Sequence, residues 1–312
     1  MHTGSATVPL PSLGAWLSYG LGTLNPNLPA YVVLAEHLPY AGAQVWDCGF
    51  LPGEHQGVRI VPGDRPVADL DPGPRPATLR DLEAMLRRRL DETHAAERPD
   101  ASDLRARLRS FDIARGMMRE APEVFDLSHE SGPVRARYGI GPGDRKSFAW
   151  QCLVARRLVE RGVRFVQIFH ESWDQHGNLS ADLRRNCAAT DRASAALVAD
   201  LKQRGLLEDT IVIWGGEFGR TPMVQGGNDG RDHHPNGFSY WVGGGGFRPG
   251  LTWGETDDLG FNAVKDRVHV HDFHATLLHQ LGFDHEKLTY RFQGRDFRLT
   301  DVAGEVIRGL LV

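Results

Sequence analysis

The spacing of hydrophobic and polar positions divides the chain into two parts. In residues 78–90 and 100–121, apolar residues recur every three to four positions after a polar start, which predicts two amphipathic helices. Residues 30–34 are rich in β-branched and aromatic residues and predict a strand, whereas the proline and glycine of residues 62–76 predict a loop. We expect the many arginines of the two helices to form a solvated face rather than a binding surface.

From residue 146 onward, strands and helices alternate. A helix over 147–161 precedes a short β-rich run at 163–169, a long helix over 183–205, a buried-type strand at 210–215 and a further strand at 238–244. This alternation predicts an α/β fold with a mainly parallel central sheet flanked by helices. We expect the strands at 163–169 and 210–215 to be neighbours or near-neighbours in that sheet.

The length of the chain accommodates one large α/β domain over residues 1–312. We expect residues 1–145 to supply loops, peripheral helices and at least one strand, and residues 146–312 to form the core. Hydrophobic residues make up 41% and charged residues 24% of the chain, which is ordinary for a globular protein. The composition therefore indicates a protein with a sizeable core.

Net charge and segment lengths exclude several classes of partner. The formal net charge of −4 gives no electrostatic case for binding nucleic acid or an anionic membrane surface. No apolar run approaches the roughly 20 residues that cross a bilayer. Met1 is not followed by a basic and then apolar segment, so the chain as written shows no export signal. Three scattered cysteines, Cys48, Cys152 and Cys187, predict neither a disulfide framework nor a thiolate zinc site.

Charged and imidazole side chains gather next to the predicted strands of the core. In open α/β sheets, ligands bind beyond the carboxyl ends of the strands, so residues from separate segments are expected to meet there. Carboxylate oxygen and imidazole nitrogen suit Zn²⁺ or Mn²⁺, and suit Ca²⁺ or Mg²⁺ less well. The candidates are Asp174 and His176 after the first strand, Glu217 and Arg220 after the second, and Arg231, Asp232, His233 and His234 before the third.

Each of these groups has a simpler interpretation when it is taken alone. An isolated Asp-x-His after a strand is more often a turn with a helix cap, Glu217 could pair with Arg220, and adjacent histidines are common in exposed loops. Their shared position next to strands favours a site that holds a metal and an anion. A later histidine-rich stretch falls on a helix over 272–281, where Asp272 is a plausible N-cap. We expect His274 and His279 of that helix to face solvent or neighbouring helices.

Several motifs resemble known families. The run from Thr190 to Pro222 is similar to the alkaline phosphatase and sulfatase superfamily, where an Asp-bearing helix leads to a strand that ends in Ser-Asp-His-Gly. "WDQHGN" resembles the metal motif of cofactor-independent phosphoglycerate mutases. A more specific resemblance, over nearly the whole chain, is to the bacterial sulfatase-like family called domain of unknown function 1501. It is carried by "GVRFVQIFHESWDQHGN", "GGEFGRTP", "GRDHHP" and "LTYRFQGRDFRLTDV".

The resemblance implies an alkaline phosphatase-like (sulfatase-like) fold and a set of metal ligands. Asp174 and His176 match the first metal motif, Glu217 takes the place of the Asp in the Asp-His pair, and His234 or His233 matches the late histidine. Phe218 stands where the superfamily has a metal-binding histidine. One ligand of a second metal site is therefore missing.

The start of the chain also departs from the family pattern. The superfamily opens with a strand that carries a metal-binding Asp and a nucleophile, whereas this chain begins Met1-His2-Thr3-Gly4-Ser5. We therefore expect an N-terminally incomplete fold, with either an open groove beside 163–169 or a substitute strand from 29–35.

The function implied by the resemblance is metal-dependent hydrolysis of a phosphate or sulfate ester, in a small-molecule or glycan substrate. Arg220 or Arg231 would bind the tetrahedral anion. Because the expected nucleophile segment is missing, we expect hydrolysis to be impaired. The alternative is a non-catalytic pseudoenzyme, or a carbohydrate- or surface-binding protein, on the same fold.

Overall fold

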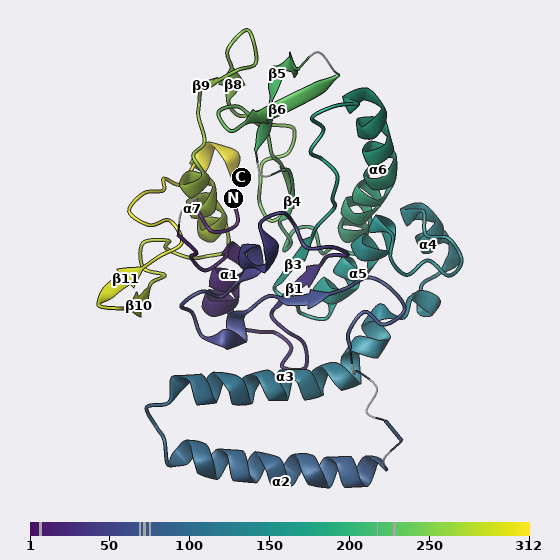
Figure 1. The fold of residues 1–312 in the computed structure, drawn as a ribbon, viewed down its shortest axis with the longest axis vertical. Coiled ribbons are helices and arrows are strands. Elements are labelled where there is room, and N and C mark those ends of the chain that lie inside the picture. Colours follow the sequence, from purple (N-terminus) through teal and green to yellow (C-terminus); the bar gives the residue numbers. More distant parts are fainter. Residues whose placement is uncertain (6–7, 69, 71–72, 75, 217, 227–228) are drawn as a thin grey trace. The chain divides into compact units, whose positions relative to one another are not determined.

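The computed structural model describes residues 1–312 except 6–7, 69, 71–72, 75, 217 and 227–228 (Figure 1). The chain forms two compact units. We call the first the sheet unit; it contains Pro9–Glu130 and Arg157–Phe169. We call the second the site unit; it contains Met1–Val8, Ser131–Arg156 and His170–Val312.

The sheet unit is built on three parallel strands in the order β2-β1-β3. The central strand β1, Tyr31–Leu34, is buried at all four residues, as expected of a strand with a neighbour on each side. It pairs with β2, Val58–Ile60, and with β3, Phe165–Ile168. The strand predicted at 30–34 is confirmed, and so is the prediction that a strand from 29–35 lies beside 163–169.

Apolar side chains from the strands and the connecting segments form the core of the sheet unit. The buried Trp46 packs with Tyr31 and Val33 of β1 and with Ala35, the residue that follows this strand. Phe165 lies against this cluster. Helix α1, Leu13–Leu21, contacts β1 and β3. Its first turn is capped by Ser12, whose hydroxyl accepts a hydrogen bond from the Ala15 amide at 3.3 Å.

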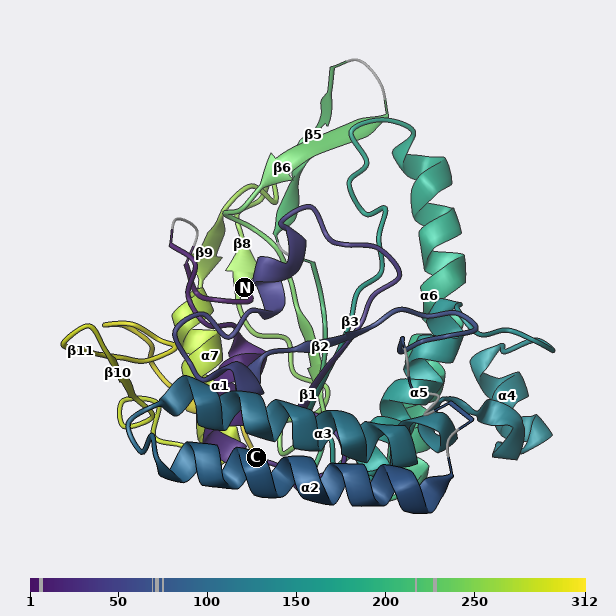
Figure 2. The same cartoon turned by 60° about the horizontal axis from the view of Figure 1, so that its bottom comes forward.

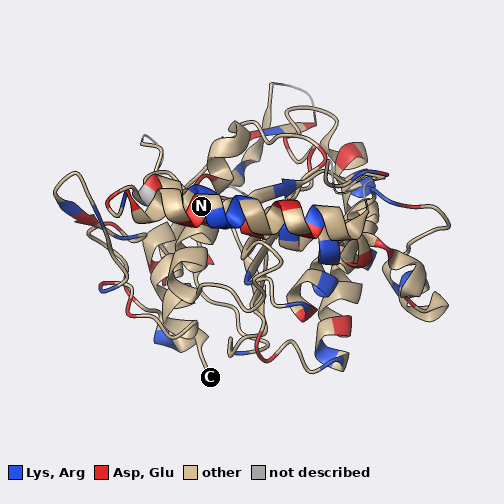
Figure 3. Cartoon of the chain, turned by 90° about the horizontal axis from the view of Figure 1, so that it is seen from below, with Lys and Arg blue, Asp and Glu red and all other residues tan. Residues whose placement is uncertain are grey.

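The two predicted arginine-rich helices are confirmed as α2, Ala77–Ala96, and α3, Ser102–Phe125. Figures 1 and 2 show them side by side as a helical hairpin. Helix α3 buries Ala106, Met117, Ala121 and Val124, whereas α2 buries no residue. Arginines are interspersed with Asp and Glu along α2 (Figure 3). The described part of 62–76 contains no helix or strand, as expected. The unit also contains the 3-10 turns η1, Gly42–Trp46, η2, Gly53–His55, and η3, Leu127–His129.

Three helices of the site unit meet at one buried carboxylate. The helices are α4, Gly132–Tyr138, α5, Phe148–Glu160, and α6, Leu179–Gln203. Asp200 of α6 lies 3.1 Å from Arg156 Nε of α5 and accepts a hydrogen bond from the Tyr138 hydroxyl of α4 at 3.0 Å. Both charged side chains are almost fully buried. The helices predicted at 147–161 and 183–205 are thus confirmed as α5 and α6.

The strand predicted at 210–215 is confirmed as β4, Val212–Trp214, but its predicted neighbour is wrong. β4 pairs antiparallel with β7, Trp241–Gly243, whereas β3 belongs to the three-stranded parallel sheet. The four glycines at 243–246 favour this pairing. A side chain on Gly244, whose φ is +75°, would come within 2.3 Å of the Thr210 carbonyl oxygen. The glycines therefore let the end of β7 approach the start of β4 more closely than other residues would.

Short antiparallel pairs and a helix complete the described part of the site unit. Helix α7, Val270–Gln280, begins earlier than predicted, because His269 is its N-cap and Asp272 forms the second half of a capping box. His274 is buried and donates to the Met1 carbonyl oxygen at 2.7 Å, so it does not face solvent. The remaining elements are β5, Gly219–Gln225, β6, Gly230–His234, β8, Glu255–Thr256, β9, Ala263–Lys265, β10, Tyr290–Phe292, β11, Arg295–Phe297, and η4, Arg308–Leu310.

Candidate metal centre

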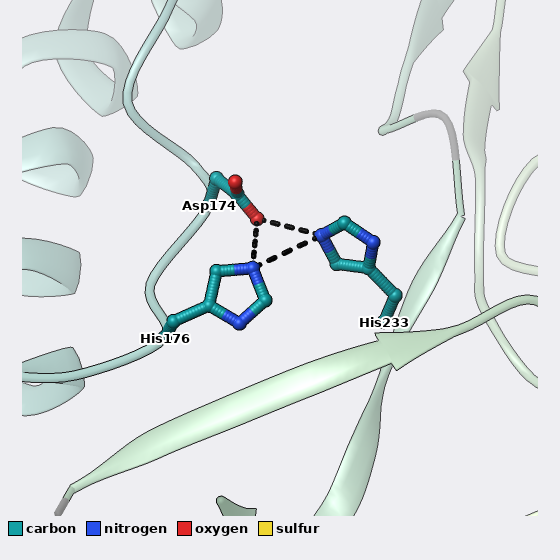
Figure 4. Close-up of side chains that lie close together, drawn as sticks. All are labelled: Asp174, His176 and His233. Atoms are coloured by element: carbon teal, nitrogen blue, oxygen red, sulfur yellow. Dashed lines mark hydrogen bonds and ion pairs between the residues drawn. The ribbon is translucent and has the colours of Figure 1, made fainter.

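Three of the predicted ligands meet at one point of the site unit. Asp174 and His176 lie in the segment before α6, and His233 lies on β6 (Figure 4). Asp174 Oδ1 is 3.0 Å from His176 Nε2 and 2.9 Å from His233 Nε2, and the two Nε2 atoms are 3.1 Å apart. The structure thus brings together one carboxylate oxygen and two imidazole nitrogens from segments that are far apart in the sequence.

Backbone hydrogen bonds hold these two segments side by side. The Arg231 amide of β6 donates to the Gln175 carbonyl oxygen at 3.0 Å. At the other end of the segment, the amide of Leu179 donates to the Asp229 carbonyl oxygen at 3.0 Å, and the amide of Ser180 donates to the Asp229 carboxylate at 2.9 Å. Asp229 thereby satisfies amides of the first turn of α6, which have no partner within the helix. Contacts on both sides of His176 fix its position relative to β6.

The β5–β6 hairpin approaches the His176 segment at a glycine. A Cβ atom on Gly230 would lie 2.0 Å from the carbonyl oxygen of His176 and 2.6 Å from the amide nitrogen of Gly177. Real Cβ atoms do not come so close to backbone atoms, so only glycine allows β6 to lie at this distance. The glycine at position 230 therefore allows β6, which carries His233, to lie close to the segment that carries His176.

Asp174 is held in its charged form. Its partial burial acts to raise the pKa, but hydrogen bonds from His233 and Arg220 and the charges of Arg220 and His176 outweigh this effect. The pKa of Asp174 is lowered to about 2. The carboxylate is therefore an anion at neutral pH, which is the form that binds a metal.

Of the two predicted anion-binding arginines, the structure brings Arg220 to the cluster. Arg220 Nη2 lies 2.5 Å from Asp174 Oδ1 and donates to the Trp173 carbonyl oxygen at 3.2 Å. Its Nη1 atom is buried and has no hydrogen-bond partner among the residues that the structure describes. Arg231 Nη1 instead donates to the Gly230 carbonyl oxygen at 2.9 Å.

Of the two adjacent histidines, His233 joins the cluster and His234 does not. His234 is 5% exposed, its Nε2 is hydrogen-bonded to the Phe261 carbonyl oxygen, and its ring packs on the Phe261 ring. Successive side chains of a strand point to opposite faces. The two histidines of β6 therefore belong to different surroundings. Glu217, the remaining predicted ligand, lies outside the described residues.

Two further side chains contact the histidines of the cluster. Phe218 packs its ring against that of His233, with centroids 4.9 Å apart. Gln225, at the end of β5, places Oε1 2.6 Å from His176 Nδ1. Nothing in the sequence singles out Gln225, because it belongs to no motif and its contact with His176 depends on the folding of β5.

The donor set fits a divalent cation. Atoms bound tetrahedrally at about 2.0–2.1 Å from a zinc ion are separated from one another by about 3.3 Å, and the three separations here are 2.9, 3.0 and 3.1 Å. Three protein ligands with free positions for water or substrate are typical of catalytic rather than structural zinc sites. All three side chains are exposed, so a ligand can reach them from solvent.

The described residues thus define a mixed α/β protein with an Asp-His-His cluster at its surface. The chain belongs to the family described as "Protein of unknown function (DUF1501)", whose model matches residues 1–311. No curated protein and no solved structure matches the chain. None of the described helices combines the length and the apolar character needed to span a membrane.

Proposed function

We propose that the chain is a metal-dependent hydrolase of phosphate or sulfate esters, of the alkaline phosphatase and sulfatase type. Asp174, His176 and His233 hold its divalent cation. The observation that carries the proposal is the convergence of their ligand atoms within 4.8 Å of one another, although His176 and His233 are 57 residues apart. One carboxylate and two imidazoles favour Zn²⁺ or Mn²⁺ over Ca²⁺ or Mg²⁺, which prefer oxygen ligands.

When bound, the cation would polarise the ester oxygen and lower the pKa of a coordinated water molecule. The residues of the chain supply the surroundings for that chemistry. Asp174 contributes negative charge, and the Arg220 guanidinium next to it contributes a fixed positive charge for an anionic ester group. Arg231 lies on the same β6 strand as His233, and we assign it no contact with the ester.

The exposure of the cluster is compatible with both small and large substrates. The side chains of Asp174, His233 and His176 are 62%, 47% and 40% exposed, so no wall of the described residues encloses the ligand atoms. A buried pocket would restrict the substrate to a small molecule, whereas an open site admits an ester group on a small molecule or on a glycan. The proposal accordingly covers both.

Phe218 favours a second candidate, a protein that binds the metal without hydrolysis. Its ring packs on His233 at the position where the superfamily resemblance expects a metal-binding histidine. A phenyl ring offers no ligand, so the site is limited to one cation in the part of the chain that the structure describes. A one-metal, non-catalytic site for recognition of a carbohydrate or a surface is the alternative function.

Metal content and turnover test the proposal together. The purified chain is stripped with a chelator, reloaded with Zn²⁺ or Mn²⁺, and analysed for bound metal and for hydrolysis of 4-nitrophenyl phosphate and 4-nitrophenyl sulfate. We expect close to one metal ion per chain, lost in Asp174→Asn and in His233→Ala. His129→Ala is the matched control, because His129 Nε2 also lies near a carboxylate, 3.6 Å from Asp126 Oδ2, but with no third ligand in the described residues.

The outcomes separate the two candidates. Metal-dependent turnover that disappears with Asp174→Asn supports the hydrolase. Stoichiometric metal without turnover of either ester supports the non-catalytic alternative. No metal binding by a chain that folds normally by circular dichroism would overturn both.

A further inference from the structure

We propose that Gln225 is a positioning residue that selects the tautomer of His176 and so keeps the metal centre open to a cation. This inference rests on the proposed metal centre, and it assigns a role to a side chain that offers no metal ligand of its own. Gln225 is the last residue of β5, and its Oε1 atom lies 2.6 Å from His176 Nδ1.

The hydrogen bond between Gln225 and His176 determines where the imidazole proton is. An amide oxygen carries no hydrogen and can only accept, so Nδ1 of His176 is the protonated ring nitrogen. Nε2 of the neutral ring is then unprotonated, and its lone pair points into the cluster. Second-shell partners of this kind orient metal-binding histidines in proteins and strengthen them as ligands.

The opposite tautomer would close the site. With the proton on Nε2, His176 would donate directly to Asp174 Oδ1, which lies 3.0 Å away. That internal hydrogen bond would satisfy both groups and remove the lone pair that a cation requires. With the proton on Nδ1, Nε2 of His176 keeps its lone pair, 3.0 Å from Asp174 Oδ1, and His233 Nε2 is the imidazole nitrogen that donates to this oxygen. Such a cluster is stabilised by a proton or a cation between its members, so the Gln225 contact favours metal binding.

The fold of β5 places Gln225 for this role. Arg220 and Gln225 are both on β5 and both contact the segment from Trp173 to His176. Their odd separation in sequence would place them on opposite faces of a regular strand. The pairing of β5 with β6 shifts in register between Arg220 and Val224. This irregularity interrupts the alternation, and both side chains reach the same segment.

The test compares two variants at Gln225 in the full chain. Gln225→Leu keeps the size of the side chain but removes the acceptor, whereas Gln225→Glu restores an acceptor at the same place. Met223→Leu is the control, because Met223 is an exposed side chain of the same strand. The readouts are the tautomer of His176 in the metal-free protein, from ¹⁵N NMR of labelled histidine near pH 8, and the affinity for Zn²⁺, from competition with a chromophoric chelator.

We expect the Nδ1–H tautomer in the wild type, in Gln225→Glu and in Met223→Leu, and a shift towards Nε2–H in Gln225→Leu. Zn²⁺ affinity should fall about 10- to 100-fold in Gln225→Leu, the typical effect of removing such a partner, and should be retained in Gln225→Glu.

If the wild type binds Zn²⁺ and Gln225→Leu changes neither the tautomer of His176 nor the affinity for Zn²⁺, the role of Gln225 is overturned while the metal centre stands. If the wild type binds no Zn²⁺, the proposed function fails. An Nε2–H tautomer of His176 in the wild type would overturn the role of Gln225 whether or not Zn²⁺ binds.

Discussion

The Nη2 atom of Arg220 lies 2.5 Å from Oδ1 of Asp174, the same oxygen that faces the two histidines of the cluster. Asp174 is therefore shared between an arginine and an imidazole pair. A cation that binds the histidines must share this oxygen with Arg220, or displace the guanidinium towards an anionic ligand. The pair thus links metal binding to anion binding, and it determines how Asp174 responds to pH.

The first prediction concerns the titration of Asp174. Its pKa in the folded protein is about 2, below the value of about 3.9 for an unfolded chain. A carboxyl group with a lowered pKa stabilises the fold at pH values above its unfolded pKa, and this contribution is lost as the pH falls through the folded value. The ¹³C chemical shift of the Asp174 carboxyl should therefore titrate with a midpoint near 2, and Arg220→Gln should raise that midpoint.

The Asp126 carboxyl is the control for this titration, because hydrogen bonds from Ser128 are the main cause that lowers its pKa and Arg220 is not among the causes. Its midpoint should not move in Arg220→Gln. A wild-type midpoint near 4 for Asp174 would show that the Arg220 contact does not form in solution.

The second prediction separates the two histidines of β6. His233→Ala should remove metal binding, because it deletes one of three ligands. His234→Ala should retain metal binding but lower the free energy of unfolding by about 1–3 kcal/mol, because the Phe261 carbonyl oxygen loses its partner. Metal analysis and urea unfolding of both variants give the comparison. Loss of metal in His234→Ala, with a fold unchanged by circular dichroism, would contradict the placement of His234.

The third prediction uses the close approach of Gly230 to the backbone of the His176 segment. Gly230→Ala should weaken metal binding at least tenfold, because the added methyl group would meet the His176 carbonyl oxygen and push β6 away from the ligand segment. Gly177→Ala is the matched control, since a Cβ there meets nothing within 4 Å and its φ is not positive. Zinc titration of both variants checks the result. Equal affinities would mean that His233 does not depend on this approach.

The fourth prediction concerns the buried ion pair of the site unit. Asp200→Leu should destabilise the protein by about 3–5 kcal/mol, because it removes the Asp200 carboxylate from the buried Arg156 charge. The double variant Arg156→Met with Asp200→Leu should be less destabilised than Asp200→Leu alone, since the buried Arg156 charge is removed with the carboxylate, although Tyr138 and the half-exposed Arg204 still lose their contacts with Asp200. Denaturant unfolding measures both. A double variant as unstable as the sum of its single changes would show that the pair is not coupled.

The sequence by itself determined the local elements. Helices α2, α3, α5 and α6 follow from apolar residues at helical spacing, and strands β1, β3 and β4 follow from short β-branched runs between glycine and proline. Such patterns are local, because they record which face of a segment avoids water. For the same reason, the sequence identified Asp174 and His176 as a candidate pair, since their spacing after a strand is visible without any tertiary contact.

Tertiary structure decided which of these parts meet. β4 pairs with β7 and not with β3. The hydrophobic pattern of a strand does not determine which strand it pairs with, and the glycines at 243–246 allow β7 to approach β4 closely. His233 rather than His234 joins Asp174, because the alternation along β6 and its pairing with β5 determine which histidine faces the 174–176 segment. Gln225 reaches His176 through a register shift in the hairpin, and hydrogen bonds between distant segments leave no periodic trace in the sequence.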